Sequence, residues 1–228
     1  MPKSLLVTSA AASEGKSITS LAITQHFARL GLKVLLIDAD MRNPSLHKLL
    51  RADNAIGLSS YLIGRCTPPE AIQKTEIPNL AFLPSGPLPP NAADLLSTSR
   101  LTSMLSLSLE VFDLVIIDGP PVLGIADAPL LSNAAEATVF VIGAGIARIG
   151  SVRGALKRLN IAKSPLIGSV VTRFDAKRAG YGYGRYGYGY AYGYGYGLTY
   201  GEQAFSRAKK APRLDPQLET AANSEAPS

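Results

Sequence analysis

The residues best suited to chemistry lie in the stretch "SAAASEGKS", residues 9–17. Ala10, four further residues, then Gly15, Lys16 and Ser17 fit the pattern G-x-x-x-x-G-K-S/T, with alanine replacing the first glycine. In such a loop backbone N–H groups surround a β-phosphate, the lysine reaches the β- and γ-oxygens, and the serine hydroxyl ligates Mg²⁺. The stretch therefore predicts a phosphate-binding loop, the P-loop, with nucleotide contacts at Ala12, Ser13, Glu14, Gly15, Lys16, Ser17 and Ile18.

Three aspartates follow apolar runs elsewhere in the chain. Asp38 and Asp40, with Arg42, close "LLIDADMRNP", and Asp118 closes "LVIID" before "GPP". Ligand sites in open α/β sheets lie beyond the carboxyl ends of the strands, so these carboxylates are expected to converge on the P-loop. One strand-terminal aspartate is usually a helix cap or turn former. Three beside a P-loop are better explained by a hydrated Mg²⁺ whose waters need anionic partners.

Short apolar runs alternate with longer segments of helical pattern, as in a parallel sheet covered on both faces. We therefore expect a three-layer α/β P-loop domain over residues 1–174, with a mostly parallel central sheet flanked by helices. A proline-rich loop from residue 85 is expected to feed a helix that begins near Asn91 or Ala92, with Asp94 in its first turn. The expected strands are residues 4–9, 33–38, 79–85, 113–118, 137–143 and 165–172, and the first helix is residues 16–30.

Residues 175–228 form a predicted disordered tail, because alternating glycine and tyrosine offers no core and much backbone entropy. Residues 173–213 carry 8 Lys or Arg against 2 Asp or Glu within a chain of net charge +6. This excess favours acidic partners such as phosphorylated tails, nucleic acid or anionic lipid, or it simply keeps the tail soluble. The tyrosines are Tyr181, Tyr183, Tyr186, Tyr188, Tyr190, Tyr192, Tyr194, Tyr196 and Tyr200.

The remaining composition predicts a soluble cytoplasmic chain. The apolar runs are shorter than the ~20 residues of a membrane-spanning helix. The N-terminal "MPKSLLVTS" does not resemble a signal peptide, because its apolar run leads into a polar loop that contains lysine. Cys66, the one cysteine of the 228 residues, cannot form an internal disulfide, which suits a reducing compartment.

The chain resembles the bacterial tyrosine kinases that regulate capsular and extracellular polysaccharide export. The features that carry this resemblance are the P-loop, the Asp-x-Asp-x-Arg motif, the Asp-x-Pro-Pro motif, the stretch "PPNAADLLS" and the tyrosine cluster. The resemblance covers about residues 3–200. In that family the first three motifs are Walker A, Walker A′ and Walker B. The resemblance implies a P-loop fold unrelated to eukaryotic protein kinases, whose H-R-D and D-F-G signatures this chain lacks.

The resemblance implies a protein-tyrosine autokinase that uses ATP and Mg²⁺, phosphorylates the nine tail tyrosines in trans and regulates polysaccharide synthesis and export. The implied catalytic residues are Lys16, which holds the phosphates, Asp38, which receives or orients the tyrosine proton, Asp40, and Arg42, which positions the loop or neutralises charge. The implied metal ligands are Ser17, Asp40 and Asp118. Thr172 stands where the family often has a base-contacting asparagine. Thr172 and Arg173 are expected nucleotide contacts, and recognition of the adenine is expected to rely on neighbouring backbone.

The resemblance also implies partners. These are the tails of neighbouring subunits, a membrane-anchored activator that is fused upstream or separate, a cognate tyrosine phosphatase, and a ring-like homo-oligomer in the full-length context. Nucleic acid is not expected. The family's E-x-x-R-x-x-R helix is missing upstream of the first strand, and two interpretations of Met1 are open: it begins the protein, or it is an internal methionine of a longer one. The expected location is cytoplasmic, at the inner face of the plasma membrane through an activator or a missing transmembrane region.

Three other interpretations are open at this point. The chain could be a partitioning or cell-division switch ATPase, although those proteins usually carry a signature lysine where this chain has Ala11. The basic aromatic tail could bind RNA or single strands, but Arg185 is the one arginine within the repeat. A self-associating tail on a nucleotide hydrolase is the third interpretation.

Overall fold

The computed structural model describes residues 2–175. The predicted tail and its nine tyrosines lie outside the described residues, so the boundary between residues 1–174 and 175–228 stays a prediction. Within residues 2–175 no helix is both long enough and apolar enough to cross a bilayer.

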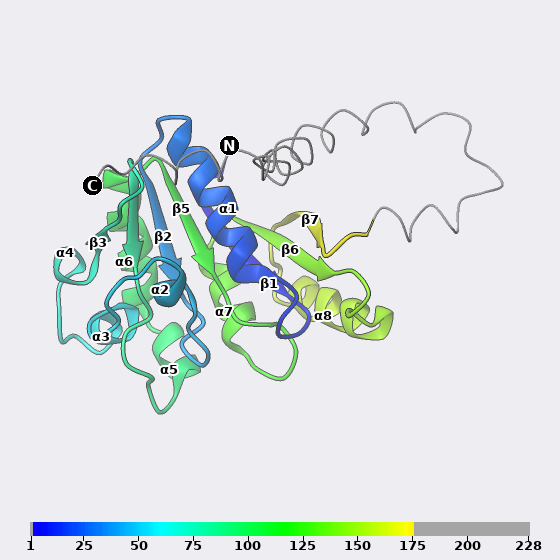
Figure 1. Ribbon diagram of the computed structural model, residues 1–228. Helices are drawn as coiled ribbons and strands as arrows, with labels where there is room; N and C mark the ends of the chain where they lie inside the picture. Colours follow the sequence, from blue (N-terminus) through cyan, green and yellow to red (C-terminus); the bar gives the residue numbers. More distant parts are fainter. Residues whose placement is uncertain (1, 176–228) are drawn as a thin grey trace, which may run out of the picture. The chain divides into compact units, whose positions relative to one another are not determined.

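The centre of the molecule is one sheet of seven strands (Figure 1). The strands are β1 (Ser4–Ser9), β2 (Val34–Asp38), β3 (Gln73–Lys74), β4 (Leu80–Leu83), β5 (Leu114–Asp118), β6 (Ala137–Gly143) and β7 (Leu166–Thr172). Their order across the sheet is β3-β4-β2-β5-β1-β6-β7. Every neighbouring pair is parallel except β3 with β4. The prediction of a mostly parallel α/β sheet is confirmed.

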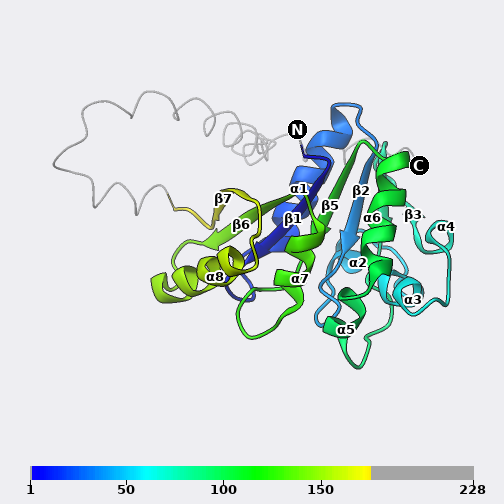
Figure 2. The same ribbon diagram turned by 180° about the vertical axis from the view of Figure 1, so that it is seen from behind.

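Helices cover both faces of this sheet, as Figures 1 and 2 show from opposite sides. The first helix lies on one face, and the later long helices lie on the other. The helices are α1 (Lys16–Arg29), α2 (Leu46–Leu49), α3 (Leu58–Leu62), α4 (Pro68–Ala71), α5 (Ala92–Leu96), α6 (Ser99–Val111), α7 (Asp127–Ala134) and α8 (Ile149–Ile161).

The core follows the two-residue period of the strands. Leu5 and Val7 of β1 pack with Ala28 of α1 on one face, whereas Leu6 packs with Met104 of α6 and other residues on the opposite face. Alternate side chains of a strand point to opposite faces, so a continuous apolar run can serve two helical layers. This arrangement confirms the predicted three layers.

The predicted elements agree with the observed ones to within one or two residues. The helix expected over residues 16–30 spans Lys16–Arg29, and α5 begins at Ala92 after Asn91 at its N-cap, with Asp94 in the first turn. The two-residue strand β3 was not predicted, because its antiparallel pairing with β4 depends on a tertiary contact. The parallel strands end together at one edge, where the loops after β1, β2 and β5 meet.

Candidate phosphate-binding and metal site

The P-loop joins β1 to α1 in the strand, loop and helix order that the sequence predicted. Ser13 and Gly15 have φ angles of 64° and 97°, the left-handed values that allow successive N–H groups to face one side. Ala10, which replaces the first glycine, is buried and donates its N–H to Glu14 Oε2 at 3.1 Å. The Glu14 side chain, 1% exposed, therefore braces the loop from inside. This role of Glu14 was not predicted.

A cavity of about 450 Å³ lies beside the P-loop. It brings together most of the predicted site residues from the loops after β1, β2 and β5 and from the end of β7. The predicted residues that line it are Ala12, Ser13, Gly15, Lys16, Ser17, Ile18, Asp40, Arg42 and Arg173. Asn43, Ser45, Pro120, Pro121 and Ile125 complete the lining. The predicted residues that are not among the lining residues are Glu14, Asp38, Asp118 and Thr172.

Lys16 and Asp40 form an ion pair in the lining of the cavity. Lys16 Nζ lies 3.8 Å from Asp40 Oδ2, and both side chains are nearly buried. Burial raises the pKa of Asp40, and the Lys16 ammonium opposes that rise. The pair thus places one cation and one carboxylate where a nucleotide phosphate and its metal would meet.

Asp118, the last residue of β5, is fully buried behind the cavity. Its Oδ1 accepts a hydrogen bond from Ser20 Oγ at 2.9 Å, whereas Oδ2 has no hydrogen-bond partner among residues 2–175. Burial raises the pKa of Asp118 to about 6, and the hydroxyls of Ser17 and Ser20 oppose this rise. A buried carboxylate oxygen without a donor is costly unless a cation or its water binds there.

These groups fit Mg²⁺. The predicted ligands Ser17, Asp40 and Asp118 supply oxygens only, as this ion prefers. Mg²⁺ usually keeps several waters and is bound through one or two carboxylates together with substrate phosphates.

Asp38, the last residue of β2, holds the loop that follows it. Its Oδ2 accepts hydrogen bonds from the N–H groups of Ser45 and Leu46 at 3.2 and 3.1 Å, and Oδ1 accepts one from Asp40 at 3.3 Å. Burial raises the pKa of Asp38 to about 7, and the negative charge of Asp118 adds to this rise. The hydrogen bond from the Leu46 N–H opposes it. The role of proton acceptor assigned to Asp38 stays a prediction, since its carboxylate lies behind the cavity wall.

Arg42 forms a two-pronged ion pair with Asp127, a partner that sequence reasoning missed. Arg42 Nε and Nη2 donate to the two carboxylate oxygens of Asp127 at 2.8 and 3.1 Å. Asp127 is buried in the first turn of α7, whereas the Arg42 side chain is 47% exposed. The pair ties the loop after β2 to α7. The role of Arg42, to position this loop or to neutralise charge, stays a prediction.

Ser20 and Ser45 were also missed. Ser20 lies one helical turn after Lys16, and that spacing could have placed it on the same face of α1. Ser45 Oγ lies 3.2 Å from Ser17 Oγ, a contact across 28 residues that no local pattern signals.

Thr172 and Arg173, predicted as nucleotide contacts, both bind the P-loop backbone. Thr172 Oγ1 donates to the carbonyl oxygen of Glu14 at 2.6 Å, and Arg173 Nη2 donates to the carbonyl oxygen of Ser13 at 3.0 Å. Arg173 also lines the cavity. A contact of either residue with the base stays a prediction.

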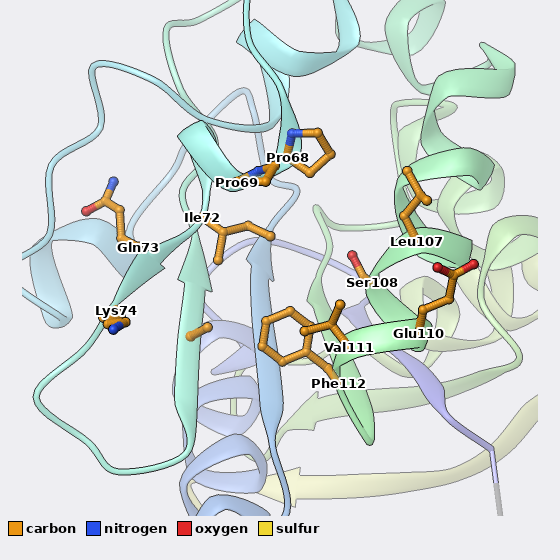
Figure 3. Close-up of a pocket in the computed structure, with 11 residues that line it drawn as sticks. Pro68, Pro69, Ile72, Gln73, Lys74, Leu107, Ser108, Glu110, Val111 and Phe112 are labelled. Atoms are coloured by element: carbon orange, nitrogen blue, oxygen red, sulfur yellow. The ribbon is translucent and has the colours of Figure 1, made fainter.

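A larger cavity of about 610 Å³ lies away from these residues (Figure 3). Ile72, Val111 and Phe112 contribute its apolar lining, and its charged lining residues are Lys74 and Glu110. It contains none of the predicted site residues and no P-loop backbone. The smaller polar cavity is therefore the candidate functional site.

The chain is similar to several known proteins. Residues 9–154 match the family described as AAA domain. The tyrosine-protein kinase YwqD of Bacillus subtilis (strain 168) is 39% identical over 169 residues, which cover 74% of this chain and 71% of the relative.

The chain is also similar to solved structures. The kinase domain of the Escherichia coli tyrosine kinase ETK superposes with a TM-score of 0.74 at 30% identity, covering 84% of this chain and 73% of that one. The septum site-determining protein MinD from Pyrococcus horikoshii OT3, complexed with Mg-ADP, has a TM-score of 0.64 at 22% identity, covering 75% and 70%. The likeness to MinD shows the P-loop fold alone.

Proposed function

The chain belongs to the bacterial tyrosine-protein kinases, and on that premise we propose that it transfers the γ-phosphoryl group of ATP, in trans, to tyrosines of its own C-terminal tail. The observation that carries the proposal is the convergence of Lys16 and Asp40 on one cavity, with Asp118 buried behind it. The switch-ATPase interpretation is supported by fold likeness alone.

The chain's own residues would act mainly by position and charge. The P-loop N–H groups and Lys16 hold the β- and γ-phosphates. Mg²⁺ bound at Ser17, Asp40 and Asp118 would neutralise charge on the phosphate oxygens. The tyrosine oxygen forms a bond to the γ-phosphorus as the bond to the ADP oxygen breaks, and the phenol proton passes to a carboxylate of the site. Arg42, held by Asp127, keeps the loop that carries Asp40 in place.

The position of Tyr61 supports the tail as the acceptor. Nine of the ten tyrosines lie between residues 181 and 200, and Tyr61 is the remaining one. Tyr61 is 6% exposed, and the guanidinium of Arg100 lies 4.9 Å from the centre of its ring. An acceptor oxygen must approach the γ-phosphate to ~3 Å, which a side chain packed in this way cannot do.

Several further proposals rest on family membership. We propose that phosphorylation regulates the synthesis and export of an extracellular or capsular polysaccharide. We also propose a membrane-anchored activator, a ring of subunits, a cognate phosphatase and a location at the inner face of the plasma membrane.

Incubation with Mg·ATP is expected to add several increments of ~80 Da to the intact protein. Trypsin cleavage after Arg178, Arg185 and Arg207 gives two peptides that contain all nine tail tyrosines, and the added mass should be confined to them. Mass spectrometry with and without an activator segment measures this, and Lys16→Met is the inactive control. An isotope-labelled Lys16→Met chain mixed with active chain should gain phosphate if transfer is in trans. ATP hydrolysis without phosphotyrosine, even with activator present, would instead indicate a switch ATPase.

Phosphorylation of the tail is also expected to reduce self-association. Each phosphate adds about −1.5 to −2 charges, so several of them reverse the excess of 8 basic over 2 acidic residues in the region 173–213. When all nine tyrosines are phosphorylated, the negative net charge of this region is larger in magnitude than the positive charge it replaces, so the tails repel one another more strongly. Light scattering should give a lower mass for the phosphorylated protein, and equal masses would contradict this expectation.

A further inference from the structure

The end of β7 holds two peptide units of the P-loop through hydrogen bonds. Thr172, the last residue of β7, donates to the carbonyl oxygen of Glu14, and Arg173 donates to that of Ser13. A trans peptide unit points its C=O and its N–H in opposite directions. When the carbonyls of Ser13 and Glu14 are held by β7, the N–H groups of Glu14 and Gly15 therefore point away from it.

These two N–H groups are free to bind phosphate. No residue within 2–175 accepts a hydrogen bond from the N–H of Glu14 or Gly15. A row of two unpaired N–H groups, in a loop where Ser13 and Gly15 have left-handed φ angles, is an anion-binding arrangement. The orientation of this row is what the contacts from β7 determine.

The contact is close as well as polar. A Cβ added to Gly15 would lie 3.1 Å from Thr172 Cγ2, and one added to Gly143 would lie 3.3 Å from Glu14 Cα. Gly143 and Thr172 are partners in the β6–β7 ladder, and Ala144 N–H donates to the carbonyl oxygen of Thr172 at 2.9 Å. The sheet thus fixes the Thr172 side chain, and that side chain in turn fixes the loop.

We propose that Thr172, assisted by Arg173, is a positioning residue that pre-sets the phosphate-binding N–H groups of Glu14 and Gly15. The proposal rests on the proposed function, because it assumes that this loop binds the phosphates of a nucleoside diphosphate or triphosphate. It assigns Thr172 to the phosphates through the P-loop backbone, in place of the base contact expected from its position in the sequence. Without the Thr172 hydroxyl, the loop samples other orientations. Phosphate then binds only the fraction of molecules with the competent orientation, so the apparent affinity falls.

The test measures dissociation constants for Mg·ADP and for Mg·pyrophosphate, which has no base, by titration calorimetry on the full chain. Thr172→Val removes the hydroxyl but keeps the shape and strand preference, and Thr172→Ser retains the donor. Loss of one positioning hydrogen bond is expected to weaken both ligands by the same factor of ~10 in Thr172→Val, and by less than ~3 in Thr172→Ser.

Thermal unfolding without ligand separates positioning from stability. Both variants are expected to keep Tm within about 4 °C of the parent. A loss of Tm with unchanged affinities would show a purely structural role and overturn the proposal. Weaker Mg·ADP binding with unchanged Mg·pyrophosphate binding would show that Thr172 contacts the base, and this result would also overturn the proposal. No acceptor tyrosine is involved, so a chain that binds both ligands as expected but forms no phosphotyrosine contradicts the proposed kinase function alone.

Discussion

Asp118→Asn is expected to stabilise the nucleotide-free protein while removing most of its phosphotyrosine formation. Asp118 is fully buried, and burial raises its pKa from the ordinary 3.8 to about 6. A rise of about two units corresponds to about 3 kcal/mol by which the folded state disfavours the charged carboxylate. Asparagine keeps an acceptor for Ser20 and carries no charge. At pH 8 in EDTA we expect a Tm gain of about 4–10 °C.

The pH dependence of this gain follows from the direction of the pKa shift. The folded state binds the Asp118 proton more tightly than the unfolded state, so the parent gains stability at low pH. That stability is fully present below about pH 4 and is lost as the pH rises through about 6. The difference between variant and parent should therefore be largest above pH 7 and vanish near pH 4. Thermal scans across this range measure it.

The loss of activity has a different cause. Asp118 is the proposed metal-binding carboxylate of β5, and removing such a group is expected to cost ~100-fold in phosphotyrosine formation. Asp113→Asn, at the exposed residue immediately before the same strand, is the matched control, because asparagine can still accept the hydrogen bond from the Lys33 N–H. It should change neither property. A lower Tm for Asp118→Asn than for the parent at pH 8 would contradict the expectation that the buried charge of Asp118 destabilises the protein without metal.

The sequence was enough to predict the elements that carry the site, because these depend on local patterns. Gly15, Lys16 and Ser17 follow one apolar run, and Asp38 and Asp118 end two others. In a parallel sheet, strand ends share an edge, so convergence could be predicted without coordinates. These statements needed only periodicity and motif spacing.

The partners of those residues could not be predicted in the same way. Arg42 and Asp127 are 85 residues apart, and Thr172 reaches Glu14 across 158 residues. Such pairs depend on how the loops pack once the sheet has formed. The side chain of Asp38 is a related case, because its position in the sequence suggested a reactive carboxylate, whereas three backbone N–H groups occupy it.

The remaining large effect is expected at Gly57, which precedes α3 at a place where two backbone segments touch. A Cβ on Gly57 would lie 2.2 Å from the carbonyl oxygen of Pro84 and 2.4 Å from the N of Gly86. The same segments are joined by hydrogen bonds from Leu58 N–H to Pro84 and from Ser59 N–H to Ser85, at 2.8 and 2.9 Å. Backbone cannot give way as a side-chain end can, so alanine must break these bonds.

Gly57→Ala is therefore expected to cost about 3–5 kcal/mol in the free energy of unfolding and to lower Tm by at least ~6 °C. Gly154→Ala is the matched control, because Gly154 lies within α8 and its added Cβ would meet Leu123 at 3.8 Å, an ordinary contact. That change should raise the free energy of unfolding by about 0.5–1 kcal/mol, because it removes backbone freedom from the unfolded chain. Urea midpoints compare the two variants with the parent. Opposite signs from the same chemical change would show that the close approach at Gly57 controls stability, whereas a parent-like midpoint for Gly57→Ala would show that residues 84–86 can move aside.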